Sequence, residues 1–127
     1  MNEGQASAIA SRWAGQELLV SPREDSILVL EPDAVLLAHP EEGVWYVQHV
    51  WGPPRRWPAL FLALADELIR RGQGKRPVRW RRGGPVARLA DRLLRPRAAA
   101  EHELVRSEFT AEEALPILER YRGLDPV

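Results

Sequence analysis

The chain has 127 residues, and its 18 Lys and Arg balance its 18 Asp and Glu. With 45% hydrophobic and 28% charged residues, it has the composition of one folded domain rather than of a disordered chain. It has no cysteine, which excludes disulfides and thiolate chemistry, and no apolar run reaches the length of about 18 residues that indicates a membrane span. No basic N-terminus precedes an apolar stretch, so we expect no signal peptide and a cytoplasmic protein.

The first half of the chain predicts one helix followed by three strands. Apolar residues at helical spacing predict a helix over residues 5–19. Residues 26–30 and 34–38 are short apolar runs separated by a Glu-Pro-Asp turn sequence, which predicts a hairpin. Residues 44–51 are rich in Val and aromatic side chains and predict a third strand. The short turns indicate an antiparallel meander.

Helices and strands alternate in the second half. Apolar residues from Leu60 to Leu68 recur at three- and four-residue intervals and predict the most hydrophobic helix of the chain. We expect the strand after it to pair parallel to the third strand, because a helix joins the two. The remaining segments predict a strand at 77–81, a helix at 85–94, a spacer at 97–101 and a strand at 102–109.

Residues 110–127 predict a C-terminal helical extension of the same domain. The extension begins at a capping box formed by Thr110 and Glu113, is kinked by Pro116 and ends at Gly123. Together these elements predict an α/β (α+β) fold in a single domain over residues 1–127. Its centre is a mixed, mostly antiparallel sheet of about four to six strands flanked by helices.

The zero net charge conceals a basic segment. Residues 70–97 carry eleven basic side chains against a single Asp91, whereas the segments on either side are acidic. Such a charge attracts phosphate, nucleic acid or an acidic protein surface. Alternatively, the arginines form a solvated face and pair with acidic residues of the same chain. Almost all the basic residues are arginine, a bias that suits a thermophilic source.

Five tryptophans are many for a chain of this length, and several lie beside arginines. Exposed aromatic rings with arginine suit single-stranded nucleic acid, so Arg79, Arg81, Arg82 and Trp57 are the candidate contacts for nucleic acid or an acidic partner. Alternatively, the tryptophans fill the core and arginines pack over their edges. We expect the five side chains to form a buried and an exposed group: Trp13, Trp45 and Trp80 in the first, Trp51 and Trp57 in the second.

The order of helix, hairpin, long strand, turn, helix, strand, helix and strand resembles the GNAT N-acetyltransferase superfamily over roughly residues 5–109. The stretch VWYVQHVWGPPRRWPALFLALADELI is also similar to phage-encoded, GNAT-like virion proteins, in which a Trp-containing strand leads to an Arg/Pro turn and a Phe/Leu-rich helix. The resemblance implies an acetyl-coenzyme A cofactor. Gln48 and Val50 would hold it at the strand end, and Arg55 and Arg56 at the pyrophosphate turn.

A few side chains are candidates for the acid–base chemistry of an acetyl transfer. His49 is a candidate general base because imidazole titrates near neutral pH, and Tyr46 or Tyr121 is a candidate proton donor to the leaving thiolate. Each of them could instead be a packing residue. The three histidines do not have the spacing of a metal site, so we expect no metal.

The turn after the third strand lacks the glycines of the family's pyrophosphate loop, and Pro53, Pro54 and Pro58 have no N–H to donate. Two functions therefore stay open. The first is an acetyl-coenzyme A-dependent N-acyltransferase, or a catalytically degenerate relative that belongs to a phage virion. The second is a non-enzymatic interaction protein that binds nucleic acid or an acidic protein partner through residues 70–97. A homo-oligomer is compatible with both.

Overall fold

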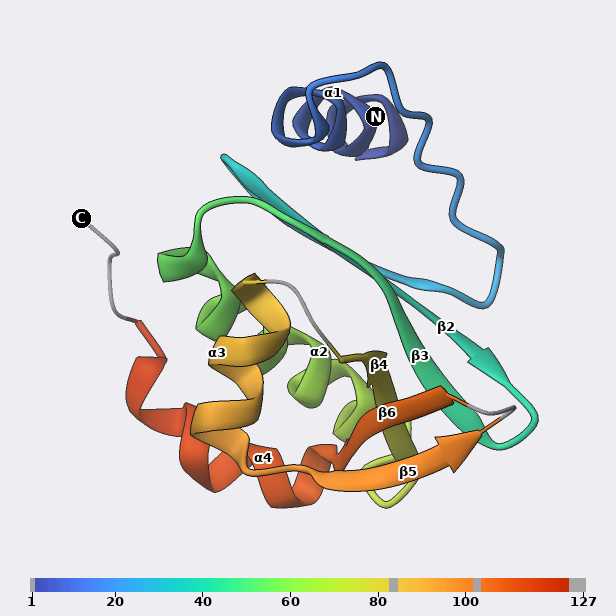
Figure 1. Ribbon diagram of the computed structural model, residues 1–127, viewed down its shortest axis with the longest axis vertical. Helices are drawn as coiled ribbons and strands as arrows, with labels where there is room; N and C mark the ends of the chain where they lie inside the picture. The colour runs from blue at the N-terminus through green and yellow to red at the C-terminus, as the bar shows by residue number, and fades with distance from the viewer. Residues whose placement is uncertain (1, 83–84, 102–103, 124–127) are drawn as a thin grey trace.

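The computed structural model describes residues 2–82, 85–101 and 104–123 and contains a six-stranded sheet with helices on both faces (Figure 1). The strands lie in the order β1-β2-β3-β4-β6-β5. Neighbouring strands are antiparallel except β3 and β4, which run parallel. The predicted mixed, mostly antiparallel sheet is therefore confirmed. The strands are β1 Ile27–Glu31, β2 Ala34–Glu41, β3 Val44–Trp51, β4 Pro77–Arg81, β5 Arg97–Glu101 and β6 Leu104–Thr110.

Three helices cover one face of the sheet and one helix covers the other (Figure 1). Helix α2 joins β3 to β4, which explains why these two strands are parallel. None of the described helices is long and apolar enough to cross a membrane. The three helices on one face are α2 Trp57–Arg70, α3 Pro85–Leu94 and α4 Ala111–Leu118, and the helix on the opposite face is α1 Asn2–Ala14. Two short 3-10 turns are η1 Pro54–Arg56 and η2 Glu119–Tyr121.

The larger hydrophobic core lies between the sheet and α2, α3 and α4. Its centre is the Phe61 ring, which contacts the rings of Trp57, Trp80 and Phe109 at centroid distances of 5.6, 5.8 and 6.3 Å. A smaller core lies between α1 and the opposite face of β2. Because β2 is buried on both faces, residues 34–38 read as a continuous apolar run rather than an alternating one.

The structure corrects three predicted element boundaries. Residues 97–101, predicted as a spacer, form the edge strand β5, because pairing with β6 imposes an extended backbone on an alanine-rich segment with little strand preference of its own. The first helix ends at Ala14 instead of residue 19, since Gly15 adopts a positive φ of 71°. The last helix ends at Leu118 and continues only as the 3-10 turn η2.

Two tryptophans lie where the sequence did not place them, and Trp51, predicted to be exposed, is only partly exposed and packs against the smaller core. Trp13, predicted to be buried, is 45% exposed and donates its indole N–H to the Asp33 carbonyl at 3.3 Å. Trp57, predicted to be exposed, is only 5% exposed. It stands one helical turn before Phe61 in α2, so the face that buries Phe61 also buries Trp57. Trp45 and Trp80 are buried as predicted.

Candidate functional site

The two parallel strands separate part of the way along the sheet. β4 pairs with β3 from Trp45 to Val47, and β3 then continues to Trp51 with pairing to β2 alone among the described residues. A β-bulge at Gln48 interrupts the pairing with β2, since Val47 lies opposite Ala38 and His49 lies opposite Leu37. A bulge bends its strand and increases its twist. We call the place where β3 leaves β4, after Val47 and Trp80, the fork.

A depression of about 460 Å³ opens at the fork. It lies on the face of the sheet that carries Tyr46, beyond the part covered by α1. The depression brings together three of the predicted site residues: Tyr46, Gln48 and Arg81, the last of which is exposed at the end of β4. Its lining consists of His39, Glu41, Glu42, Tyr46, Val47, Gln48, Arg81, Glu101 and Arg106.

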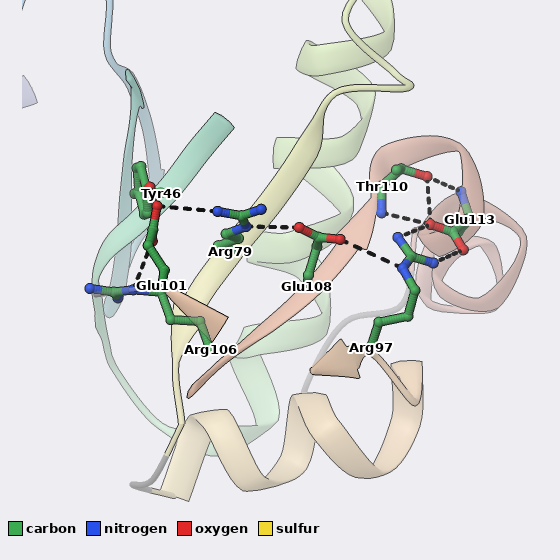
Figure 2. Close-up of polar contacts among 8 residues, drawn as sticks. All are labelled: Tyr46, Arg79, Arg97, Glu101, Arg106, Glu108, Thr110 and Glu113. Atoms are coloured by element: carbon green, nitrogen blue, oxygen red, sulfur yellow. Dashed lines mark hydrogen bonds and ion pairs between the residues drawn. The ribbon is translucent and has the colours of Figure 1, made fainter. Parts of the chain in front are cut away.

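A row of charged side chains of alternating sign runs from Tyr46 on β3 to Glu113 at the start of α4, as Figure 2 shows. Arg79 donates to Glu108 at 2.8 Å and to Glu101 at 3.2 Å. Arg97 lies 3.6 Å from Glu108 and donates two hydrogen bonds to Glu113, at 2.6 and 2.9 Å. We call these side chains the charge ladder: Tyr46, Glu101, Arg79, Glu108, Arg97 and Glu113, with Arg106 beside Glu101 at 3.3 Å.

The charge ladder fixes Tyr46 as a hydrogen-bond donor. Its hydroxyl donates to Glu101, and the guanidinium of Arg106 lies 5.5 Å from the centre of its ring. Burial raises the pKa of Tyr46, and the Glu101 carboxylate raises it further, while Arg79 acts in the opposite direction. The hydroxyl therefore stays protonated at neutral pH, as a proton donor must be. No local pattern marks Glu101 as a site residue, because its segment is predicted to be a spacer.

His49 lies outside the depression. Its ring stacks on Trp51 at a centroid distance of 6.4 Å, on the part of the sheet nearer the end of β3. Burial lowers the pKa of His49, and the nearby His39 lowers it further. The imidazole is therefore neutral near pH 7, the form that accepts a proton. The structure thus places the two predicted catalytic side chains, Tyr46 and His49, on one strand but only Tyr46 in the depression.

The turn after β3 is tied to the β1–β2 hairpin. The Asp33 carboxylate lies 2.7 Å from Arg56 Nε and 3.5 Å from an Arg55 terminal nitrogen. Arg56 is largely covered, with 17% of its side chain exposed, whereas the Arg55 side chain is 54% exposed. Val50 packs against the larger core, so only its backbone is available to a ligand. The partner Asp33 was predicted only as a turn residue, since nothing local links it to Arg56.

The four residues predicted to bind nucleic acid or an acidic partner do not share one surface. Trp57 is buried in the core beneath α2, and Arg79 belongs to the charge ladder on the opposite face. Arg81 and Arg82 are exposed at the end of β4. Other arginines of residues 70–97 also have partners within the chain, as the alternative interpretation of this segment proposed: Arg70 and Arg71 bond to Glu67.

The end of the charge ladder predicts a pH dependence of stability. The hydrogen bond from Arg97, followed by that from Thr110, lowers the pKa of Glu113 to about 2 from an ordinary 4.5. A carboxylate with a lower pKa in the folded state stabilises the fold above pH of about 4.5, and this contribution is lost as the pH falls towards about 2. As the pH falls from about 4.5 to about 2, we expect the free energy of unfolding to decrease less for Glu113→Gln than for the wild type. Urea unfolding at each pH measures this free energy.

Glu112→Gln is the matched control, since Glu112 is the neighbouring residue and lies outside the charge ladder. Its pH profile should follow that of the wild type. Parallel profiles for wild type and Glu113→Gln would contradict the assignment of this contribution to Glu113.

Comparisons of the chain with family models, with curated proteins and with solved structures found no match. The described residues include no group of three or more His, Asp or Glu that could hold a metal ion. The fork, the depression and the charge ladder are therefore the features of the chain that point to a function.

Proposed function

We propose that this chain is a GNAT-like domain that binds an acyl-coenzyme A at the fork between β3 and β4. The observation that carries the proposal is that β3 extends past the end of β4. On the side of β4, the backbone of residues 48–51 therefore has no described strand beside it. In the superfamily that the sequence resembles, the pantetheine arm binds backbone groups at this place. The depression of about 460 Å³ reaches the first of these residues, Gln48.

The order of strands and helices also supports the proposal. A meander of three antiparallel strands leads through α2 to the parallel strand β4, and α3 then leads to an antiparallel hairpin. As far as α3 this is the order that the sequence resemblance implies; after α3 the resemblance implies one strand, and the structure has the two strands β5 and β6. Gln48 and Val50 then offer backbone groups to the pantetheine. The exposed Arg81 lies at the end of β4 beside the depression, and the exposed Arg55 follows the end of β3.

The turn after β3 offers few backbone N–H donors to the pyrophosphate of an acyl-coenzyme A. Pro53 and Pro54 have no N–H, and the Arg56 N–H already donates to the Pro53 carbonyl at 2.9 Å. A pyrophosphate therefore finds fewer donors than at a glycine-rich loop, and Arg56 is shared with Asp33. We accordingly propose a binding domain in which Tyr46 remains as a proton donor, while His49, the predicted general base, lies outside the depression.

Isothermal titration of the full chain with acetyl-coenzyme A tests the proposal. We expect saturable binding with one site per chain, weakened about tenfold by Arg81→Glu and by Arg55→Glu, because each reverses a charge that attracts the phosphates. Arg92→Glu is the matched control, since Arg92 is exposed on α3, outside the depression, and should leave the affinity unchanged.

Absence of saturable heat for the folded wild type would overturn the proposal. If the protein were then retained on heparin in a salt-dependent way, the interaction protein that binds through residues 70–97 would be the better interpretation.

A further inference from the structure

Strand β5 forms one edge of the sheet (Figure 1). Its outer side pairs with no strand of the described chain, so its N–H and C=O groups on that side have no strand partner there. Monomeric proteins usually protect such an edge with a lysine, a proline, a bulge or a covering segment. β5 contains no lysine or proline, and its register with β6 is continuous from Arg97 to Glu101.

The sequence of β5, Arg-Ala-Ala-Ala-Glu, is complementary to itself when it is reversed. We propose that β5 pairs antiparallel with β5 of a second copy of this chain, across a two-fold axis at Ala99. Arg97 then lies opposite Glu101 of the second copy, and Ala98 lies opposite Ala100. Opposite charges that face each other stabilise an antiparallel pair, and the two-fold axis produces two such pairs.

The charge ladder continues across this interface. Within one chain the ladder brings Arg97 and Glu101 to the same face of the edge strand, where Arg97 is 51% exposed. The next charge of opposite sign is Glu101 of the second copy, which is 20% exposed and also contacts Tyr46, Arg79 and Arg106 of its own chain. The other edge strand, β1, has the sequence Ile-Leu-Val-Leu-Glu, whose self-pairing would place Glu31 opposite Ile27 without an ion pair. Charge complementarity therefore favours β5 as the paired edge.

Exposed apolar side chains lie beside this edge. Leu104 and Val105, at the start of β6, are 54% and 55% exposed and pair with Glu101 and Ala100 of β5. Successive residues of a strand point to opposite faces of the sheet, so each of the two adds apolar area on one face beside β5.

Substitution of Ala99 tests both the dimer and its register, because Ala99 is the residue that faces its own copy. Ala99→Lys and Ala99→Glu each place like charges opposite each other, so each should raise the dissociation constant about fivefold. An equal mixture of the two variants should associate at least as strongly as the wild type, since Lys then faces Glu. Sedimentation velocity over a wide concentration range measures the fraction with twice the chain mass of 14.4 kDa.

Glu31→Lys, on the opposite edge, is the control and should leave association unchanged. Far-ultraviolet circular dichroism establishes that each variant is folded. The proposal is overturned if the wild type stays monomeric at all concentrations, or if both Ala99 variants associate like the wild type. It is equally overturned if the mixture of folded variants fails to recover association.

Discussion

Replacement of Phe61 with alanine is expected to lower the free energy of unfolding by about 4 kcal/mol, the range found when a large buried aromatic side chain is removed. The ring is 1% exposed and contacts Trp57, Trp80 and Phe109. These neighbours come from α2, β4 and β6, so they cannot close the space without moving whole elements. A loss of this size is a large share of the roughly 5–15 kcal/mol that stabilises a domain.

Urea unfolding, followed by tryptophan fluorescence, gives this free energy directly. Ile69→Ala is the matched control, since Ile69 lies on the same helix but is 38% exposed, and it should cost about 1 kcal/mol or less. A similar loss for the two variants would mean that the centre of the core lies elsewhere.

The sequence predicted most of the sheet and helices because local patterns determine them. The apolar period of α2, the aromatic strand β3 and the turn residues between β1 and β2 are all local signals, and each element formed where it was predicted. The one parallel pair also followed from the chain, since a helix must connect β3 and β4. Patterns within about ten residues were thus sufficient for the layers of the fold.

The parts that the sequence missed depend on contacts between distant residues. β5 is a strand only because β6 lies beside it, and Glu101 reaches Tyr46, 55 residues earlier in the chain. Asp33 holds Arg56 across the sheet edge, and no spacing rule links those two positions. The family resemblance and the candidate side chains of β3 therefore predicted Gln48 and Tyr46 as site residues but not the charges around them.

Gly52 closely approaches Ala34 and Asp33, which are distant in the sequence, and its substitution is the second change with a large expected effect on stability. Gly52 follows β3 with a φ of 139°, a conformation that side chains rarely adopt. A Cβ at this position would lie 2.5 Å from the Ala34 Cβ, 2.9 Å from the Ala34 Cα and 3.0 Å from the Asp33 carbonyl oxygen. We expect Gly52→Ala to cost about 3 kcal/mol, because overpacking adds to the backbone strain.

Gly43→Ala separates these two costs, since Gly43 has a positive φ of 82° but nothing within 4 Å of the added Cβ. It should cost about 1 kcal/mol, the strain alone. Ala34→Gly combined with Gly52→Ala should recover part of the loss, because it removes the shortest contact but leaves the Ala34 Cα and the Asp33 carbonyl in place. Equal losses for Gly43→Ala and Gly52→Ala in urea unfolding would contradict the close approach.

The same substitution connects the packing of the turn to the proposed ligand. To relieve the contact with Ala34, the turn must move away from the hairpin, which lengthens the 2.7 Å ion pair between Arg56 and Asp33. Arg55 and Arg56, which the resemblance assigns to the pyrophosphate, then leave the positions beside Asp33 in which the structure holds them. We therefore expect folded Gly52→Ala to bind acetyl-coenzyme A about tenfold more weakly, and Gly43→Ala to bind it like the wild type. Unchanged binding in folded Gly52→Ala would place the phosphates away from this turn, nearer to Arg81.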